Sequence, residues 1–141
     1  MVFQVLALHA HLIGDYVLQS HIMAVRKTSS WKWALIHALF YGIPFAGLLL
    51  FVTPDLTKKL IALVIIIGTH AVIDRYRLAV YWCKFYGAAG YPGLWWRYFP
   101  GPEEVFEPPR AFLQVWLIIL VDNTMHLCIN ALALWYASSG G

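Results

Sequence analysis

Hydrophobic residues gather into four long stretches, separated by polar or Gly/Pro-rich connections. A helix needs about 20 apolar residues, at about 1.5 Å each, to cross the roughly 30 Å hydrocarbon layer of a membrane. Because the stretches approach this length, the pattern predicts an all-α membrane protein, a four-transmembrane-helix bundle. The predicted spans lie at about residues 2–19, 34–53, 58–77 and 111–137, within one integral membrane domain covering residues 1–141.

The first stretch is the least apolar, because His9, His11, Asp15 and Gln19 interrupt it. An Asp at the centre of a membrane helix costs roughly 2.5 to 3.5 kcal/mol on the insertion scale. We therefore expect this helix to pack against the others rather than to face lipid on all sides. No Lys or Arg precedes Arg26 and no small-residue cleavage site follows, so we expect the helix to be retained rather than removed as a secretory signal.

The composition strengthens the membrane prediction. Hydrophobic residues make up 61% of the chain and charged residues 12%, against about 45–50% and about 25% in soluble domains. These values argue against a nucleotide-binding α/β domain, a disulfide-stapled secreted module and a nucleic-acid partner. Cys83 and Cys128 are far apart in the sequence and form no metal-binding motif. We expect Cys128 to be a core residue and Cys83 to be interfacial.

The distribution of basic residues predicts the orientation. Only Lys58 and Lys59 lie in the connection between the second and third spans, whereas the other two connections hold all eight remaining basic residues. By the positive-inside rule these two connections are cytoplasmic and both termini lie on the non-cytoplasmic side. We thus expect a multi-pass membrane protein. The eight residues are Arg26, Lys27, Lys32, Arg75, Arg77, Lys84, Arg97 and Arg110.

The connection at residues 84–110 is rich in Gly, Pro and aromatic residues. Aromatic side chains of this kind favour the lipid headgroup region, so we expect an interfacial loop, either without a catalytic part or acting as a lid. A weak internal repeat pairs His11-Leu-Ile-Gly-Asp15 with His70-Ala-Val-Ile-Asp74. This repeat suggests two related helical hairpins.

Three of the spans each carry a His and an Asp four residues apart, and the second span adds His37. Four residues are one helical turn plus about 40°, so both side chains of a pair lie on one face. The polar faces also include Tyr41 and Asn130, four residues beyond a His. We expect His126 to lie deepest in the membrane. The pairs are His11/Asp15, His70/Asp74 and Asp122/His126.

Charge decides between the interpretations of these pairs. No Lys or Arg lies in the interior of a predicted span, and we expect the nearest, Arg75 and Arg77 at the end of the third, to sit at the interface. We therefore expect the three acids to have no basic neighbour. A buried carboxylate takes up a proton or finds a cation. Imidazole and carboxylate groups suit divalent Zn, Fe or Mn, and a His whose far nitrogen meets an Asp is a common second-shell arrangement. A proton or ion pathway and a structural polar network remain the alternatives. The predicted metal ligands are His11, Asp15, His37, His70 and Asp74, with Asp122 and His126 as catalytic base or further ligands.

Several strings in the sequence resemble a known family: HLIGDYVLQSHIMAVRK, LIHALFYG, THAVID and DNTMH. The family consists of small bacterial and phage inner-membrane proteins catalogued as domain of unknown function 3307. The resemblance covers most of the chain except residues 84–110, and it implies an integral membrane protein without a stated activity. A looser similarity, by architecture and His/Asp usage, is to predicted membrane-bound metal-dependent hydrolases.

Three hypotheses about function follow. The first is a metal-dependent hydrolase acting on an amphipathic substrate that enters from the membrane lipids. The second is a proton or ion translocation or sensing module, which would require a homo-oligomer because four short helices rarely enclose a path. The third is a non-catalytic bacterial or phage membrane factor that docks a partner through Trp95 and Trp96.

Overall fold

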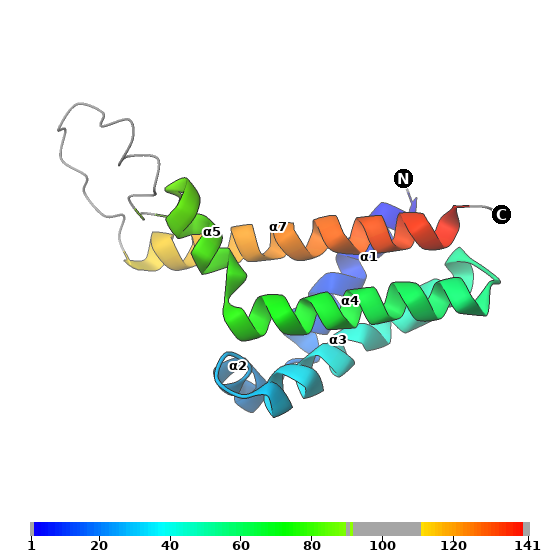
Figure 1. Cartoon of the computed structure of the whole chain (residues 1–141), viewed down its shortest axis with the longest axis horizontal. Coiled ribbons are helices and arrows are strands. Elements are labelled where there is room, and N and C mark those ends of the chain that lie inside the picture. Colours follow the sequence, from blue (N-terminus) through cyan, green and yellow to red (C-terminus); the bar gives the residue numbers. More distant parts are fainter. Residues whose placement is uncertain (1, 90, 92–110, 140–141) are drawn as a thin grey trace. The chain divides into compact units, whose positions relative to one another are not determined.

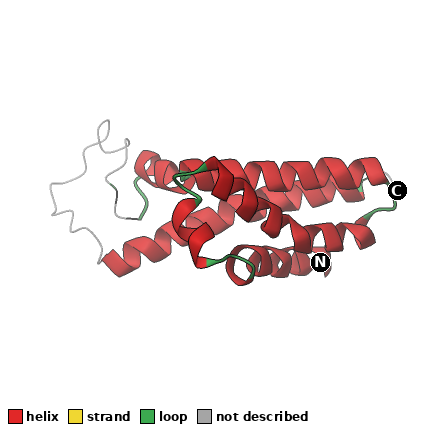
Figure 2. Cartoon of the chain, turned by 90° about the horizontal axis from the view of Figure 1, so that it is seen from below, coloured by secondary structure: helices red, strands yellow, loops and turns green. Residues whose placement is uncertain are grey.

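The computed structural model describes residues 2–89, 91 and 111–139. Within these residues all regular structure is helical and no strand occurs, as Figure 2 shows. The all-α prediction is confirmed for this part of the chain. The helices, labelled in Figure 1 where space allows, are α1 (Val2–Leu12), the π-helix η1 (Ile13–Val17), α2 (His21–Arg26), α3 (Trp31–Val52), α4 (Leu56–Tyr76), α5 (Leu78–Tyr86) and α7 (Ala111–Ser138).

Among the described residues three helices, not four, are long and apolar enough to cross a membrane: Trp31–Val52, Leu56–Tyr76 and Phe112–Ser138. The prediction of one membrane-spanning helix at residues 2–19 is wrong. The apolar part of these residues, Val5–Val17, is shorter than the three long helices and changes from α-helix to π-helix at Ile13. The chain leaves the helix after Val17, and α2 begins after Ser20, whose side chain accepts a hydrogen bond from the Met23 backbone.

The chain divides into two compact units. The first contains Met1–Tyr76 and His126–Gly141, and the second contains Arg77–Met125. In the first unit α3 and α4 pack side by side, while α1, η1 and α2 contact α3. The core of this unit combines large side chains of α3 with residues of the other helices that are mostly alanine, which allows close approach. Its members are Ala7, Ala10, Tyr41, Phe45, Leu49, Ala62, Ile66, Ala133, Leu134 and Ala137.

Two glycines allow neighbouring helices to pack closely against α3. A Cβ atom on Gly14 of η1 would lie 2.8 Å from the backbone oxygen of Tyr41, and one on Gly42 would lie 2.6 Å from the Ile67 side chain. Such distances leave no room for a methyl group without movement of the neighbours. Gly14 therefore lets η1 lie directly against α3, and Gly42 does the same for α3 and α4.

The second unit begins where α4 ends. Arg77 adopts a left-handed conformation with φ 52°, which interrupts the helix between Tyr76 and Leu78. The short helix α5 follows and occupies the start of the predicted interfacial loop. Cys83 is buried on α5, whereas Cys128 of α7 is exposed, so the expected environments of the two cysteines are reversed. Residues 92–110, with Trp95 and Trp96, lie outside the described residues.

Candidate metal centre

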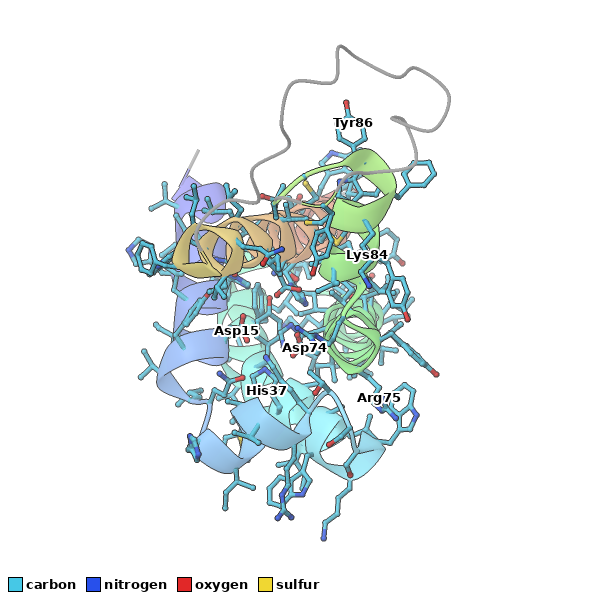
Figure 3. The ribbon with its side chains drawn as sticks, turned by 90° about the vertical axis from the view of Figure 1, so that its left-hand side faces the viewer. Asp15, His37, Asp74, Arg75, Lys84 and Tyr86 are labelled. Atoms are coloured by element: carbon cyan, nitrogen blue, oxygen red, sulfur yellow. The ribbon has the colours of Figure 1, made fainter. Side chains whose placement is uncertain are left out.

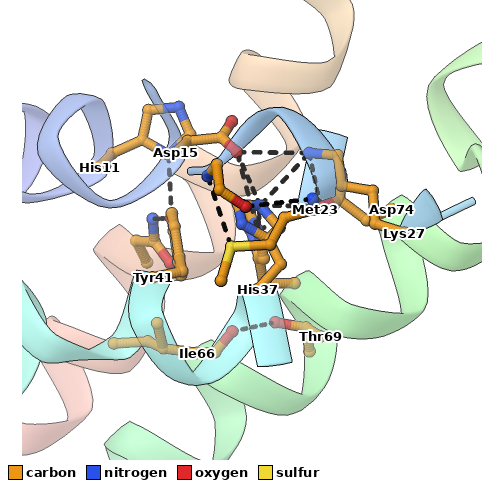
Figure 4. Close-up of polar contacts among 12 residues, drawn as sticks. His11, Asp15, Met23, Lys27, His37, Tyr41, Ile66, Thr69 and Asp74 are labelled. Atoms are coloured by element: carbon orange, nitrogen blue, oxygen red, sulfur yellow. Dashed lines mark hydrogen bonds and ion pairs between the residues drawn. The ribbon is translucent and has the colours of Figure 1, made fainter. Parts of the chain in front are cut away.

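Four buried side chains from three helical segments converge on one point of the first unit (Figures 3 and 4). Asp15 comes from η1, His37 from α3, and both His70 and Asp74 from α4. Each offers one ligand atom, and the four atoms lie within 4.8 Å of one another. Four of the five predicted ligands are thus brought together.

The distances among the four ligand atoms match a metal coordination shell. His37 Nε2 lies 3.1 Å from Asp15 Oδ1, 3.2 Å from Asp74 Oδ2 and 2.9 Å from His70 Nε2. His70 Nε2 lies 3.2 Å from Asp74 Oδ2 and 3.8 Å from Asp15 Oδ1. Ligands bound tetrahedrally at about 2.0–2.1 Å are about 3.3–3.4 Å apart. The cluster therefore has the spacing of a centre with two nitrogen and two oxygen ligands.

Hydrogen bonding alone accounts poorly for these contacts. An imidazole nitrogen carries one N–H or one lone pair, yet His37 Nε2 has three ligand atoms within 3.2 Å. Asp74 Oδ2 is buried and has ion-pair contacts, but it forms no hydrogen bond of normal geometry among the described residues. Buried polar atoms without hydrogen bonds are rare and require an explanation. The Lys27 ammonium, 2.8 Å from this oxygen, provides part of it, and a shared cation at the centre of the cluster would provide the rest.

The expected contact between the far nitrogen of each imidazole and an Asp carboxylate is not found among the described residues. The far ring nitrogens, Nδ1 of His37 and of His70, are buried without a hydrogen-bond partner in the described part of the chain. Instead, the His70 ring stacks on the Tyr41 ring, with centroids 3.6 Å apart and planes 9° apart. Aromatic packing, rather than a hydrogen bond to Nδ1, therefore orients the His70 imidazole.

The prediction that the acids have no basic neighbour is wrong for Asp15 and Asp74. Lys27, the C-cap residue of α2, places its Nζ atom 2.8 Å from Asp74 Oδ2 and 3.5 Å from Asp15 Oδ1 (Figure 4). It also lies 3.3 Å from His37 Nε2. These distances exceed the roughly 2 Å of a metal bond, so the ammonium lies beside the four ligand atoms and not between them. With both imidazoles neutral, one lysine balances one of the two carboxylates and leaves one negative charge.

The helical spacing explains one His/Asp pair and fails for another. His70 and Asp74 lie on one face of α4, as four-residue spacing predicts. His11 and Asp15 diverge because η1 intervenes, and a π-helix closes its turns between residues i and i+5. The turn carries Asp15 towards His37, while His11 stays outside the four-residue cluster.

His11 instead belongs to a second buried polar group in the same unit. Its Nδ1 atom lies 2.9 Å from the Tyr41 hydroxyl, which also accepts a hydrogen bond of 2.6 Å from Asn130 Nδ2. Because the hydroxyl accepts from Asn130, it can donate its own proton to His11. The His126 ring lies 4.3 Å from the His70 ring, centroid to centroid. The His126 ring therefore lies next to the cluster of Asp15, His37, His70 and Asp74, although the sequence predicts that His126 lies deepest in the membrane.

Asp122, the other predicted catalytic residue, belongs to the second unit and is partly buried there. Lys27 is the functional candidate that sequence reasoning missed, because its charge was assigned to membrane orientation alone. Lys27 comes two residues after Met23–Ala24–Val25, at the end of the six-residue helix α2. This short helix and the turn before it bring Lys27 back to Asp15, so no helical repeat in the sequence indicates the contact. The polar spacing did identify Tyr41 and Asn130.

Comparison with known proteins shows the family. The family model described as protein of unknown function (DUF3307) matches residues 3–139, so the chain belongs to this family. No curated protein and no solved structure matches the chain. The looser similarity to metal-dependent hydrolases is accordingly without support from these comparisons.

Proposed function

We propose that this member of the family is a membrane-embedded protein whose residues Asp15, His37, His70 and Asp74 bind one divalent metal ion. The observation that carries the proposal is the convergence of two imidazole nitrogens and two carboxylate oxygens within 4.8 Å. All four residues are buried. With the ion bound, its two positive charges would balance the two carboxylates.

The surface of the three long helices supports the membrane location. Large apolar side chains such as Phe51 of α3, Val64 of α4 and Trp135 of α7 are exposed, and a lipid environment would cover them. Following the positive-inside rule, we place the basic connections on the cytoplasmic side of a bacterial inner membrane and both termini on the other side. The metal centre, next to Lys27, would then open towards the cytoplasm.

The ligand set favours Zn, Fe or Mn, because each accepts imidazole and carboxylate ligands. Four protein ligands complete a tetrahedral zinc shell, as in structural sites. An ion that accepts more than four ligands would leave room for a water. A bound divalent ion would lower the pKa of a water far below its usual value, towards about 7, and would so supply a nucleophile. We propose hydrolysis of an amphipathic substrate on this basis, with His126 as the base.

The metal content of protein purified without chelators tests the centre. We expect a stoichiometric metal ion in the wild type and loss of the ion in Asp74→Asn, which removes a charged ligand. Asp55→Asn is the matched control, because Asp55 is exposed and only caps the start of α4. A wild type without metal, or an Asp74→Asn variant with unchanged metal content, would contradict the proposal.

Hydrolysis is tested separately. Metal-loaded protein in mixed micelles should cleave a chromogenic carboxylic or phosphoric ester with an acyl tail, and removal of the metal should abolish cleavage. Asp74→Asn should lose activity together with metal, whereas Asp55→Asn should keep both. If the metal is present and no ester is cleaved, the centre stands without the enzymatic role.

Proton or ion passage is the second candidate, and Lys27 is the observation that favours it. The Lys27 ammonium already forms ion pairs with Asp15 and Asp74 of the cluster. In the second buried polar group the Tyr41 hydroxyl links His11 to Asn130. Such chains of ionisable groups mark proton paths. A homo-oligomer in a membrane would have to enclose the path. Vesicles containing the protein should then lose a pH gradient faster than empty vesicles, and equal decay would refute this candidate.

A further inference from the structure

A second functional element adjoins the candidate metal centre: the ammonium group of Lys27. The side chain of Lys27 is 15% exposed, whereas the side chains of the four metal-ligand residues are between 0% and 6% exposed. Lys27 is therefore the member of the group most accessible from outside. Its Nζ atom lies 3.5 Å or less from three of the four ligand atoms, on the side formed by Asp15, His37 and Asp74.

The backbone at Lys27 is tied to α4. Arg75 follows the ligand Asp74 directly and donates a hydrogen bond of 2.7 Å from Nη1 to the carbonyl oxygen of Thr28. The guanidinium carbon of Arg75 lies 5.8 Å from the Trp31 ring and 5.7 Å from the Tyr76 ring. These contacts hold the segment after α2 against the end of α4, so the Lys27 side chain starts from a fixed place beside the centre.

The sum of the charges around the metal-loaded centre then predicts which kind of ligand it attracts. Two carboxylates balance a divalent ion, and two neutral imidazoles add no charge, so the Lys27 ammonium becomes one positive charge in surplus. Metal and ammonium repel each other, and the flexible stem of lysine allows Nζ to move towards its accessible side. A positive group beside a metal ion is an arrangement that binds and orients an anionic oxygen group.

We propose that Lys27 and the metal ion together form a binding site for a singly charged anionic group, such as a phosphodiester. This inference rests on the proposed metal centre and names the class of ligand or substrate that the centre takes. A metal ion that accepts a fifth ligand would contact one oxygen of the anion, and the Lys27 ammonium would donate a hydrogen bond to another. A lipid headgroup and a soluble phosphate ester share this chemistry.

Cobalt(II)-loaded protein in detergent provides the test, because the visible absorption of cobalt reports changes in its coordination. We expect dimethyl phosphate, a monoanion, to change the spectrum of the wild type, and neutral trimethyl phosphate to leave it unchanged. Lys27→Met should bind cobalt but bind dimethyl phosphate about 10- to 100-fold more weakly. Lys27→Arg should recover much of the binding, and Lys32→Met should match the wild type, because Lys32 only lies over Trp33.

The outcomes separate this inference from the proposed function. If Lys27→Met binds cobalt and dimethyl phosphate as tightly as the wild type, the anion site is refuted and the metal centre stands. If the wild type binds no cobalt, both are refuted. Nanodiscs identify the source of the anion: phosphatidylglycerol, but not a neutral glycolipid without phosphate, should change the spectrum if a lipid headgroup is the ligand. A response to dimethyl phosphate alone assigns the site to a soluble ester.

Discussion

Replacement of Gly14 by Ala tests whether the close contact of η1 with α3 positions the Asp15 carboxylate. The added Cβ atom would lie 2.8 Å from the Tyr41 backbone oxygen, 2.9 Å from its Cδ2 atom and 3.0 Å from its Cα atom. A carbon and a carbonyl oxygen in contact are about 3.3 Å apart or more. Since two of the three atoms are backbone, η1 must move away from α3 by about 0.5 Å.

That movement has two measurable consequences. Overpacking of this kind costs about 1–3 kcal/mol in the free energy of unfolding. Asp15 is the residue after Gly14, and its Oδ1 atom, 3.1 Å from His37 Nε2, moves with it. Metal–ligand distances tolerate only about 0.2 Å, so we expect metal affinity to fall at least about tenfold, the effect of losing a supporting contact.

Gly47→Ala is the matched control, because no atom of the described residues lies within 4 Å of the Cβ atom that it adds to α3. An alanine there should stabilise the helix by about 0.5–1 kcal/mol and leave metal binding unchanged. The assays are denaturant unfolding in detergent micelles and competitive metal titration with a chromophoric chelator. If Gly14→Ala and Gly47→Ala behave alike in both assays, the proposed positioning of Asp15 by η1 is refuted.

Further predictions concern the residues around the centre. Tyr41→Phe removes the hydroxyl that joins His11 to Asn130 and should lower the free energy of unfolding by about 1–3 kcal/mol; a change below measurement error in denaturant unfolding would contradict this. Metal content should fall on acidification from about pH 7 to about pH 5, because both imidazoles must be neutral to bind metal. Metal retained in full at the lower pH by elemental analysis would argue against imidazole ligands. Asp74→Asn should not bind metal at either pH.

Regular helical spacing made part of the centre predictable from the sequence. His70 and Asp74 lie four residues apart in an uninterrupted α-helix, so their common face follows directly from the helical repeat. The long apolar stretch around His37 likewise predicted α3, with its start three residues earlier than expected. In both helices the apolar pattern and the local structure agree.

Irregular local structure limited the prediction of the rest. The π-helix at Ile13–Val17 separates His11 from Asp15 and shortens the first apolar helix, and π-turns have no recognisable hydrophobic period. The position of Lys27 depends on the short helix α2 and on the Arg75 contact with Thr28, which are tertiary features. A count of basic residues within the spans could not detect a lysine that folds back from a connection.

X-ray absorption spectroscopy of the purified, metal-loaded protein tests the central claim most directly, because it reports the atoms bound to the metal. The four convergent residues predict two imidazole nitrogens and two carboxylate oxygens in the first shell, at about 2.0–2.1 Å for zinc. The imidazole scattering should weaken by half in His37→Gln. A sulfur ligand, or a shell of water oxygens without imidazole scattering, would contradict the assignment of the centre to these residues.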